Sequence, residues 1–472
     1  MNRNARCARQ ILLLNLLAIC LCAGQAFQTT SAHAQEWSQT YGDGVINEGR
    51  SMQVTSDGGF ILLGFTYAQD NFSADVLLIK TDEFGTEEWS QTYDDFINNN
   101  VYDNTDDSGY CVQETSDGGF IIAGTTSDEG DDSEDGALDI LLLKTSPSGE
   151  TEWTKVYGYP RNDAAWAVCQ TSDGGFAIAG YTVTSPWDVE GHFKELYLIK
   201  TDGSGMEEWS QIFGTEDMTA MGYALEQTAD GGFIIGGRKG PGRKIQNNTS
   251  SDVYLIKTDA SGAELWSQTF GGDYFDAGYS LQQTADGGFI LSGFKSDSDS
   301  NYADHDIYLV KTDENGTEEW SQTFGDPDTR EKGHSVQQTA DGGYIIGGTQ
   351  SYWPPSLGDG DMILIKTTEA GIEEWTQTFG SDEGYDDSGS AVRQTTDGCY
   401  VLLGRTSEGE QSLVYLVKTC GETSATAELP ARTKKLDHII DLRGRKVEPT
   451  MDQILLFIYE DGTVEKRWMS DQ

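Results

Sequence analysis

The stretch Asp341-Gly342-Gly343-Tyr344-Ile345-Ile346-Gly347-Gly348 occurs, with small changes, seven times in this chain. The other six copies begin at Asp57, Asp117, Asp173, Asp230, Asp286 and Asp397. Successive copies lie 60, 56, 57, 56, 55 and 56 residues apart. A fixed period of this size indicates a repeat architecture, in which each unit is one small supersecondary structure.

Each repeat contains four strand-like runs, A to D, as the sixth copy illustrates. Run A covers residues 333–339, a tight turn follows over residues 341–343, and run B covers 344–348. Run C covers 361–366 and run D covers 374–379, with a second turn at Gly371. Runs B and C are continuously apolar, which is typical of strands that are buried on both faces.

Two connections within the repeat have a constant length and two vary. Seven residues separate the turn Asp from the Gly of strand B in all seven copies, and nine separate the strand C Lys from the strand D Trp in the six uninterrupted copies. The B-to-C segment spans 14 to 20 residues and the D-to-A segment 20 to 28. In an up-and-down sheet these two variable connections share one rim. We therefore expect the binding face on that rim.

The ends of the repeat array complement each other. The array begins with a lone strand D at residues 36–41 and finishes with strands A, B and C of a last unit, near Thr419. Pairing these ends would remove the exposed sheet edges that a linear array leaves. The sequence thus predicts an all-β, seven-bladed β-propeller with four-stranded blades, in which the N-terminal strand closes the last blade.

The repeat motifs resemble those of known proteins. D-G-G-[FY]-I-I-x-G, L-I-K-T-D-x-x-G-x-E-x-W and W-S-Q-T-F-G-G, over residues 36–420, look like a group of secreted bacterial propeller-repeat proteins. They are also similar to the quinoprotein (PQQ) repeat, and more weakly to kelch repeats. The quinoprotein resemblance implies eight blades and a Trp-lined cofactor disc, whereas this chain has seven units and no separate cofactor motif.

The N-terminus is predicted to be a secretory signal, residues 1–34. Arg3, Arg6 and Arg9 precede an apolar run that is too short to span a bilayer. Ala32-His33-Ala34 is a small-x-small cleavage site, so the cut is expected after Ala34, with Ala26 as an alternative. The mature chain, with no later transmembrane run, is expected to be secreted or displayed on the outer cell surface.

Charge and cysteine content restrict the partners. The 78 Asp and Glu outnumber the 31 Lys and Arg, for a net charge of −47, which argues against nucleic acid and anionic membranes. We expect a monomer that binds a protein or polysaccharide. Cys111, Cys169, Cys399 and Cys420 follow the signal without metal-ligand spacing. A disulfide between Cys399 and Cys420, or buried free thiols, both fit the sequence.

Residues 421–432 are interpreted as a linker and 433–472 as a small β segment. The segment contains strand-like runs at 436–442, 454–459 and 464–469. Its pattern D-x-x-G-R-x-V … I-x-x-Y-x-D-G-x-x-x-K-R resembles the C-terminal sorting domain of the type IX secretion system, which implies export across an outer membrane. The segment is about half the usual length and lacks a Gly before the long strand. A hairpin packed on the propeller is the alternative.

Acidic loops supply the candidate metal ligands, Asp128, Asp131, Asp132 and Asp135, in the B-to-C loop of the second repeat. Residues 103–107, in the loop that leads into the same repeat, are also acidic. Clustered carboxylates of this kind suit Ca²⁺, the one cofactor that the sequence suggests. Residues 296–299 with Asp304 form a second group. Solvated loops are the alternative interpretation.

Aromatic residues supply the candidate ligand contacts. Trp187 and Trp353 lie beside prolines in B-to-C loops, where exposed rings suit carbohydrate or protein. Trp166 also departs from the repeat register, whereas six other Trp recur at one strand D position and are interpreted as structural packing: Trp89, Trp153, Trp209, Trp266, Trp320 and Trp375.

No catalytic residue is predicted. Carboxylate pairs arise by chance among 78 acidic side chains, and the histidines stand in unrelated contexts: His192, His305, His334 and His438. The sequence favours a binding scaffold. A polysaccharide hydrolase or lyase with carboxylates at the channel mouth is the alternative, and a quinone-dependent dehydrogenase is a third hypothesis.

Overall fold

The computed structural model describes residues 36–421, apart from short connections, and three strands nearer the C-terminus. The connections outside the description are 43–45, 68–73, 94–106, 128–137, 160, 185–192, 215–217, 242–249, 298–304, 327–328, 353–359, 381–385 and 409–410. Contacts divide the chain into two units, Met1–Gly421 and Glu422–Gln472. The domain boundaries expected from the sequence, including the signal segment, remain predictions.

The described part of the larger unit consists of successive four-stranded antiparallel sheets, which we number as blades. Blades 1 to 4 contain these strands: β2 (Ile46–Val54), β3 (Phe60–Tyr67), β4 (Ala74–Thr81), β5 (Glu87–Tyr93); β6 (Ser108–Glu114), β7 (Phe120–Ser127), β8 (Leu138–Thr145), β9 (Thr151–Tyr157); β10 (Ala164–Gln170), β11 (Phe176–Thr182), β12 (Glu195–Thr201), β13 (Glu207–Phe213); β14 (Met218–Gln227), β15 (Phe233–Pro241), β16 (Asp252–Thr258), β17 (Glu264–Phe270).

Blades 5 to 7 repeat the same order. Their strands are β18 (Ala277–Gln283), β19 (Phe289–Ser296), β20 (His305–Thr312), β21 (Glu318–Phe324); β22 (Thr329–Gln338), β23 (Tyr344–Tyr352), β24 (Gly360–Thr367), β25 (Glu373–Phe379); β26 (Ser388–Gln394), β27 (Tyr400–Glu408), β28 (Gln411–Thr419) and β1 (Trp37–Tyr41).

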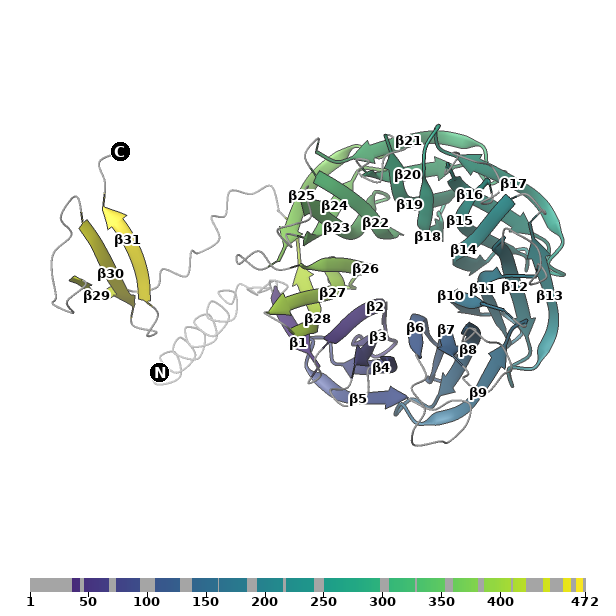
Figure 1. Cartoon of the computed structure of the whole chain (residues 1–472), viewed down its shortest axis with the longest axis horizontal. Helices are drawn as coiled ribbons and strands as arrows, with labels where there is room; N and C mark the ends of the chain where they lie inside the picture. The colour runs from purple at the N-terminus through teal and green to yellow at the C-terminus, as the bar shows by residue number, and fades with distance from the viewer. Residues whose placement is uncertain are drawn as a thin grey trace, which may run out of the picture. The chain divides into compact units, whose positions relative to one another are not determined.

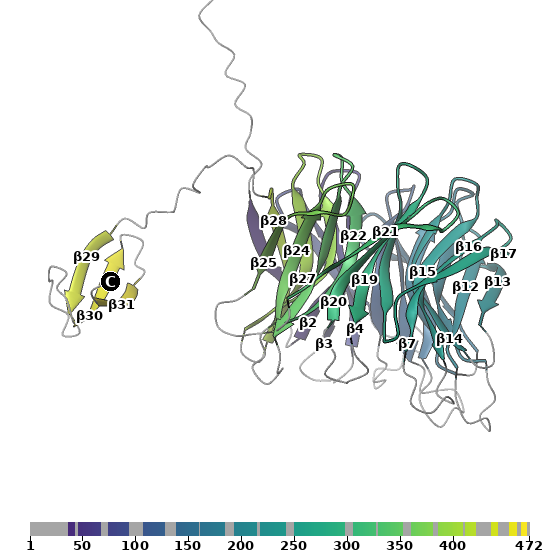
Figure 2. The ribbon, with the colours of Figure 1, turned by 90° about the horizontal axis from the view of Figure 1, so that it is seen from above.

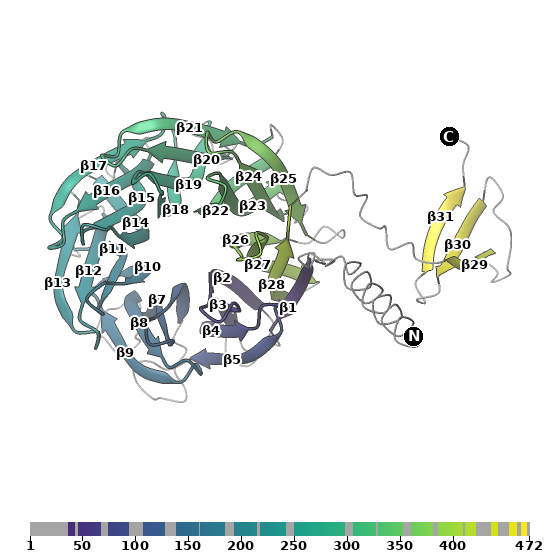
Figure 3. The ribbon, with the colours of Figure 1, turned by 180° about the vertical axis from the view of Figure 1, so that it is seen from behind.

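The blades form a closed ring with the first strand of each blade innermost (Figure 1 and, from behind, Figure 3). Five blades are separate sheets, whereas blades 1 and 7 share an eight-stranded sheet. Only one parallel pair, Ile46 with Ser412, joins β2 to β28. The same contact occurs between other neighbouring blades as isolated bridges. The eight-stranded sheet is therefore two adjacent blades, and the predicted propeller is confirmed.

The N-terminal strand completes blade 7, as the sequence predicts. β1 pairs antiparallel with β28, from Trp37 opposite Lys418 to Tyr41 opposite Val414. Glu36, just before β1, accepts hydrogen bonds from the Thr419 hydroxyl and the Cys420 amide, at 3.2 and 3.1 Å. The two ends of the larger unit thus meet within one sheet.

The recurring Trp of the outermost strand packs on the next blade, which confirms its structural role. Trp37 of blade 7 lies 6.0 Å from the Phe60 ring of blade 1, and its indole lies against Gly85. Gly85 has a φ of 75°, and a Cβ there would meet the indole at 2.5 Å. The turn before strand D therefore requires glycine both for its backbone conformation and for this contact.

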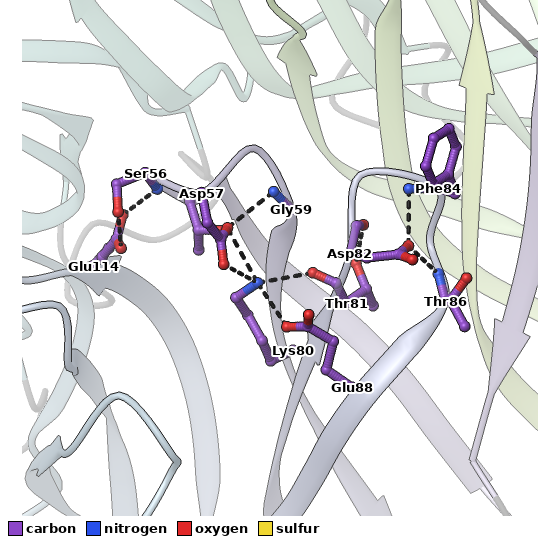
Figure 4. Close-up of polar contacts among 11 residues, drawn as sticks. Ser56, Asp57, Gly59, Lys80, Thr81, Asp82, Phe84, Thr86, Glu88 and Glu114 are labelled. Carbon is purple, nitrogen blue, oxygen red and sulfur yellow. Dashed lines mark hydrogen bonds and ion pairs between the residues drawn. The ribbon is translucent and has the colours of Figure 1, made fainter.

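A buried lysine on strand C contacts the turn Asp of its own blade, and in blade 1 it also contacts strand D (Figure 4). In blade 1, Lys80 has 7% of its side chain exposed and contacts Asp57 at 2.9 Å and Glu88 at 3.1 Å. It also donates to the Thr81 carbonyl at 2.9 Å. The Asp carboxylate caps its own turn by accepting from the Gly59 amide at 3.0 Å. This ion pair and cap explain why Asp and Lys recur at these positions.

These short turns lie along one rim of the ring (Figure 2), because antiparallel strands place the A-to-B and C-to-D turns at the same end. The strand ends that lead into the variable connections lie at the opposite rim. We call this opposite rim the variable rim.

A disulfide joins Cys399 to Cys420, which decides between the two possibilities that the sequence left open, whereas Cys111 and Cys169 are free. In the smaller unit, β29 (Leu436–Asp441), β30 (Gln453–Tyr459) and β31 (Val464–Met469) form one antiparallel sheet. Within the described residues there is no helix of the length and apolar character needed to cross a membrane.

Candidate functional site

The innermost strand of every blade has a β-bulge at the same point of the repeat. The register with the second strand shifts there by one residue, so that one side chain is left without a partner opposite it. Bulges redirect side chains in this way. The seven bulge residues, one per blade from 1 to 7, are Arg50, Tyr110, Trp166, Tyr223, Tyr279, His334 and Ser390.

All seven bulge residues line one cavity of about 300 Å³, the central cavity. The other lining residues also come from the seven innermost strands (Figure 1). In each innermost strand, which starts at the variable rim, the bulge residue is the first of the residues that line the cavity. The seven side chains therefore form a ring in the half of the cavity that is nearer the variable rim.

Four of the seven form a continuous aromatic arc across blades 3 to 6. The rings of Trp166 and Tyr223 lie 4.7 Å apart and those of Tyr223 and Tyr279 lie 5.4 Å apart. His334 stacks on Tyr279 at 5.3 Å with an angle of 15° between the rings. Each of the four is only partly buried. The arc offers a ligand a wall of adjoining π surfaces with hydroxyl and imidazole groups at its edge.

The layer three residues further along each innermost strand is structural. Gln53 Oε1 accepts from the Glu114 amide at 2.5 Å, and Gln113 Oε1 accepts from the Gln170 amide at 2.6 Å, so each blade is tied to the next. Glu226 accepts from the Gln283 amide at 2.8 Å in the same way. In blade 7 this position is Arg393, which donates to Ser335 Oγ at 3.2 Å. These side chains line the part of the cavity farther from the variable rim, where their hydrogen bonds join neighbouring blades.

Burial perturbs the titration of the arc. Burial, followed by the positive charges of Lys332 and Arg50, lowers the pKa of His334 to about 4, so its imidazole is neutral at pH 7. Burial raises the pKa of Tyr223, although Arg238 opposes the shift. Burial likewise raises the pKa of Tyr279. At neutral pH the arc is therefore uncharged.

Buried carboxylates lie three residues before the bulge in several blades, and they have structural contacts. Asp276 accepts from the amides of Ser296 at 2.9 Å and Gly272 at 2.8 Å. Asp163 accepts from the Tyr159 amide at 2.7 Å. Burial raises the pKa of Asp163 to about 7, with Asp139 adding to the shift. These carboxylates fix the chain where it leads into the next blade.

Several residues singled out from the sequence lie outside the described residues. They are the metal candidates Asp128, Asp131, Asp132 and Asp135, the ligand candidates Trp187 and Trp353, and the cleavage residue Ala34. These predictions are untested. Within the described residues, no group of three or more His, Cys, Asp and Glu could hold a metal ion.

The structure places Ser296, His305, Trp166 and His334, which the sequence analysis also singled out. Ser296, from the second acidic group, is buried and its hydroxyl lies 2.9 Å from His305 Nδ1, so both belong to the blade 5 packing. Trp166 and His334 instead lie in the arc.

Sequence reasoning missed the bulge ring as a set. Each member stands seven residues before the turn Asp of its repeat, as Tyr223 stands before Asp230 and His334 before Asp341. This constant spacing could have identified the seven positions from the sequence. The residue types differ too much for a motif. A Gly precedes the bulge residue in every repeat except the third, which has Ala165, and an isolated Gly in a strand is itself a signal for a bulge.

Comparison with known proteins gives a likeness of fold. No protein-family model and no curated protein matches the sequence. Solved structures do match. Sqt1 from Chaetomium thermophilum is 11% identical over 92% of this chain and 100% of its own, with a TM-score of 0.42. The Neurospora crassa Pan2 WD40 domain is 10% identical over 79% and 90%, with a TM-score of 0.45.

A polysaccharide lyase of family PL25, an ulvan lyase bound to a sugar fragment, also matches. It is 10% identical over 80% of this chain and 96% of its own, with a TM-score of 0.48. At these identities the comparisons say nothing about the residues in the central cavity.

Proposed function

We propose that this chain is an exported binding protein that holds an oligosaccharide segment at the variable-rim half of its central cavity. The aromatic arc is the observation that carries the proposal. Four adjoining rings, partly exposed, face a cavity whose size suits a few sugar units, and aromatic faces pack well against the C–H faces of sugars. The Tyr279 hydroxyl can hydrogen-bond ligand hydroxyls, whereas the Tyr223 hydroxyl donates to Met221 Sδ at 3.2 Å.

The rigidity of the site supports binding. The ring members lie on seven short strands whose ends are fixed by inter-blade hydrogen bonds such as Gln53 to Glu114. A site on rigid strands loses little conformational entropy when a ligand binds. The variable connections at the same rim would add contacts that differ from one blade to the next.

A lyase is the second candidate, because His334 is neutral and lies beside the tyrosines. In β-elimination a base removes the proton next to a uronate carboxyl, a C=C bond forms as the bond to the leaving sugar oxygen breaks, and that oxygen takes up a proton to leave as a hydroxyl. A neutral imidazole can accept that proton. A two-carboxylate hydrolase fits less well, since Glu226 is the only carboxylate among the described residues that line the cavity, and it is hydrogen-bonded.

Alanine at Trp166 or Tyr223 is expected to weaken oligosaccharide binding at least about tenfold, because each removes a stacking face. Isothermal titration against a panel of neutral and acidic hexasaccharides measures the effect. Ser390→Ala is the matched control, since Ser390 occupies the same ring position outside the arc. It should change the affinity less than about twofold.

The same panel tests the alternatives. A chain that binds no member, or whose binding is unaffected by Trp166→Ala and Tyr223→Ala, contradicts the proposed site. Release of an unsaturated sugar, followed by its ultraviolet absorbance and abolished by His334→Ala, would assign the lyase activity.

A further inference from the structure

Three cations surround the aromatic arc without an acidic partner. Lys194 Nζ lies 4.0 Å from the centre of the Tyr181 ring, Arg238 lies 4.9 Å from that of Phe275, and Lys332 Nζ lies 5.0 Å from that of Phe294. Among the described residues, no carboxylate forms an ion pair with any of the three. Their close partners are these aromatic faces and, for Arg238, Met221 Sδ, to which its Nε donates at 3.2 Å.

These cations are contiguous with the arc. The Tyr181 ring, which Lys194 contacts, lies 5.0 Å from the Trp166 ring. The Phe294 ring, which Lys332 contacts, lies 5.7 Å from the Tyr279 ring. Arg238 on β15 is the residue next to the Gly237 that pairs with Gly222, and it interacts with Tyr223. The cations thus come from blades 3, 4 and 6, which also supply three of the four arc residues.

Their electrostatic surroundings are unfavourable without a ligand. Burial and then the charge of Arg238 lower the pKa of Lys194, and burial and then the charge of Arg330 lower the pKa of Lys332. Mutually repelling, partly desolvated cations are uncommon in a chain where acidic residues outnumber basic ones by 78 to 31. An anion placed among them would relieve the repulsion.

Other basic residues near the ring have polar partners. Arg50 pairs with Glu48 at 2.8 Å, and Arg405 pairs with the same Glu48 at 2.6 Å. Arg393 of blade 7 forms no ion pair among the described residues, but it donates to Ser335 Oγ at 3.2 Å and to the Val392 carbonyl at 2.7 Å. Lys194, Arg238 and Lys332 lie on the side of the cavity that carries the arc. Cations beside an aromatic surface suit a sugar that carries negative charge better than a neutral sugar.

We propose that the ligand is an anionic oligosaccharide, whose carboxylate or sulfate groups contact Lys194, Arg238 and Lys332 while its sugar rings pack on the arc. The inference rests on the proposed function and narrows it to acidic sugars. The strongly negative remainder of the chain does not prevent this, because charges more than about 8 Å away are largely screened at physiological salt.

The experiment uses probe pairs that differ only in charge. One pair is a hexagalacturonate and its methyl ester, and the other is a sulfated galactan hexasaccharide and its desulfated form. Wild-type protein is expected to bind the charged member of at least one pair about tenfold or more tightly than its neutral partner, with an affinity that falls as salt rises. The preferred pair identifies the anionic group.

Each of the three cations is replaced by methionine, which removes the positive charge and keeps a long, unbranched side chain. Lys194→Met, Arg238→Met and Lys332→Met should each weaken the charged probe about threefold to tenfold and leave the neutral probe unchanged. Lys155→Met is the matched control, because it makes the same change of net charge on the outermost strand β9. It should affect neither probe.

The outcomes separate the two proposals. Equal affinity for charged and neutral probes, or charged-probe binding that survives all three cation variants, overturns the anionic ligand, and the binding function stands if Tyr223→Ala still abolishes affinity. Binding of no probe, or binding indifferent to Tyr223→Ala, overturns the binding function itself.

Discussion

Deleting residues 36–41 is expected to destabilise the larger unit by on the order of 5 kcal/mol or more, because it removes the outermost strand of blade 7. The strand supplies the ladder to β28 and two large rings that bridge to blade 1. Tyr41 is 7% exposed and its hydroxyl donates to the Gly85 carbonyl at 2.6 Å. Trp37 covers Phe60 and the turn at Gly85.

The effect should exceed that of cutting any variable connection, since it reopens the ring. Without β1, the edge of β28 is exposed, and only the other three strands of blade 7 still contact blade 1. One remaining contact is the hydrogen bond from the Ser412 hydroxyl on β28 to the Asn47 carbonyl, at 3.1 Å. Urea unfolding followed by Trp fluorescence measures the loss, and an unpaired edge should also promote association.

A transplanted strand provides the control. Residues 368–373, the C-to-D turn of blade 6, followed by residues 36–41, would replace residues 420–472 in the deleted chain. This places the same strand D beside β28 by the connection that blades 1 to 6 use. A chain with the native N-terminal strand and the same C-terminal truncation is its reference. Equal stability of the deleted and intact chains, or no rescue by the transplant, would contradict ring closure as the source.

The fold follows from the sequence because its signals are local and repeated. The turn Asp, the two glycines and the apolar runs B and C each fix one strand boundary, and seven copies remove the ambiguity of any single one. The lone strand at Trp37 and the missing strand after Thr419 then determine the closure. Here a long-range contact was predictable because both partners carry the repeat motif.

The site was less predictable because it depends on what the repeats do not share. Trp166 attracted notice as an irregular Trp and His334 as an isolated His, but their common offset from the turn Asp was not used, and the strand register is what shows that both occupy a bulge. The cation at Arg238 is brought to Tyr223 by the pairing of β14 with β15. Variable positions carry function in a repeat fold, and a consensus discards them.

Blade 4 is expected to be more sensitive than blade 5 to loss of its turn Asp, since its buried lysine lacks the second acidic partner that blade 5 provides. Lys257 is 7% exposed and contacts Asp230 at 2.9 Å, but Leu265 stands where blade 5 has Glu319. Asp230→Asn should cost about 2 kcal/mol, between the values for buried and exposed pairs, because Asp230 itself is mostly exposed.

Blade 5 provides the comparison. Lys311 keeps Glu319 at 2.9 Å when Asp286 is replaced, so Asp286→Asn should cost less than Asp230→Asn. Leu265→Glu should restore much of the stability of Asp230→Asn, since it supplies the absent carboxylate and removes an apolar side chain that is 57% exposed. Urea midpoints of the wild type and these three variants test this order. A larger loss in Asp286→Asn, or no rescue by Leu265→Glu, would contradict the two-carboxylate account.

The pH dependence of the same variants provides an independent check. Hydrogen bonds from Thr228 and then Lys257 lower the pKa of Asp230 to about 2, below its ordinary value of about 4. A lowered pKa in the folded state means that the stabilisation is complete above pH about 4 and is lost as the pH falls toward 2. The stability difference between wild type and Asp230→Asn should therefore be constant from pH 7 to 5 and shrink below pH 4. A difference that persists unchanged at pH 2 would show that the Asn variant is destabilised through its turn geometry and not through the charge of Asp230.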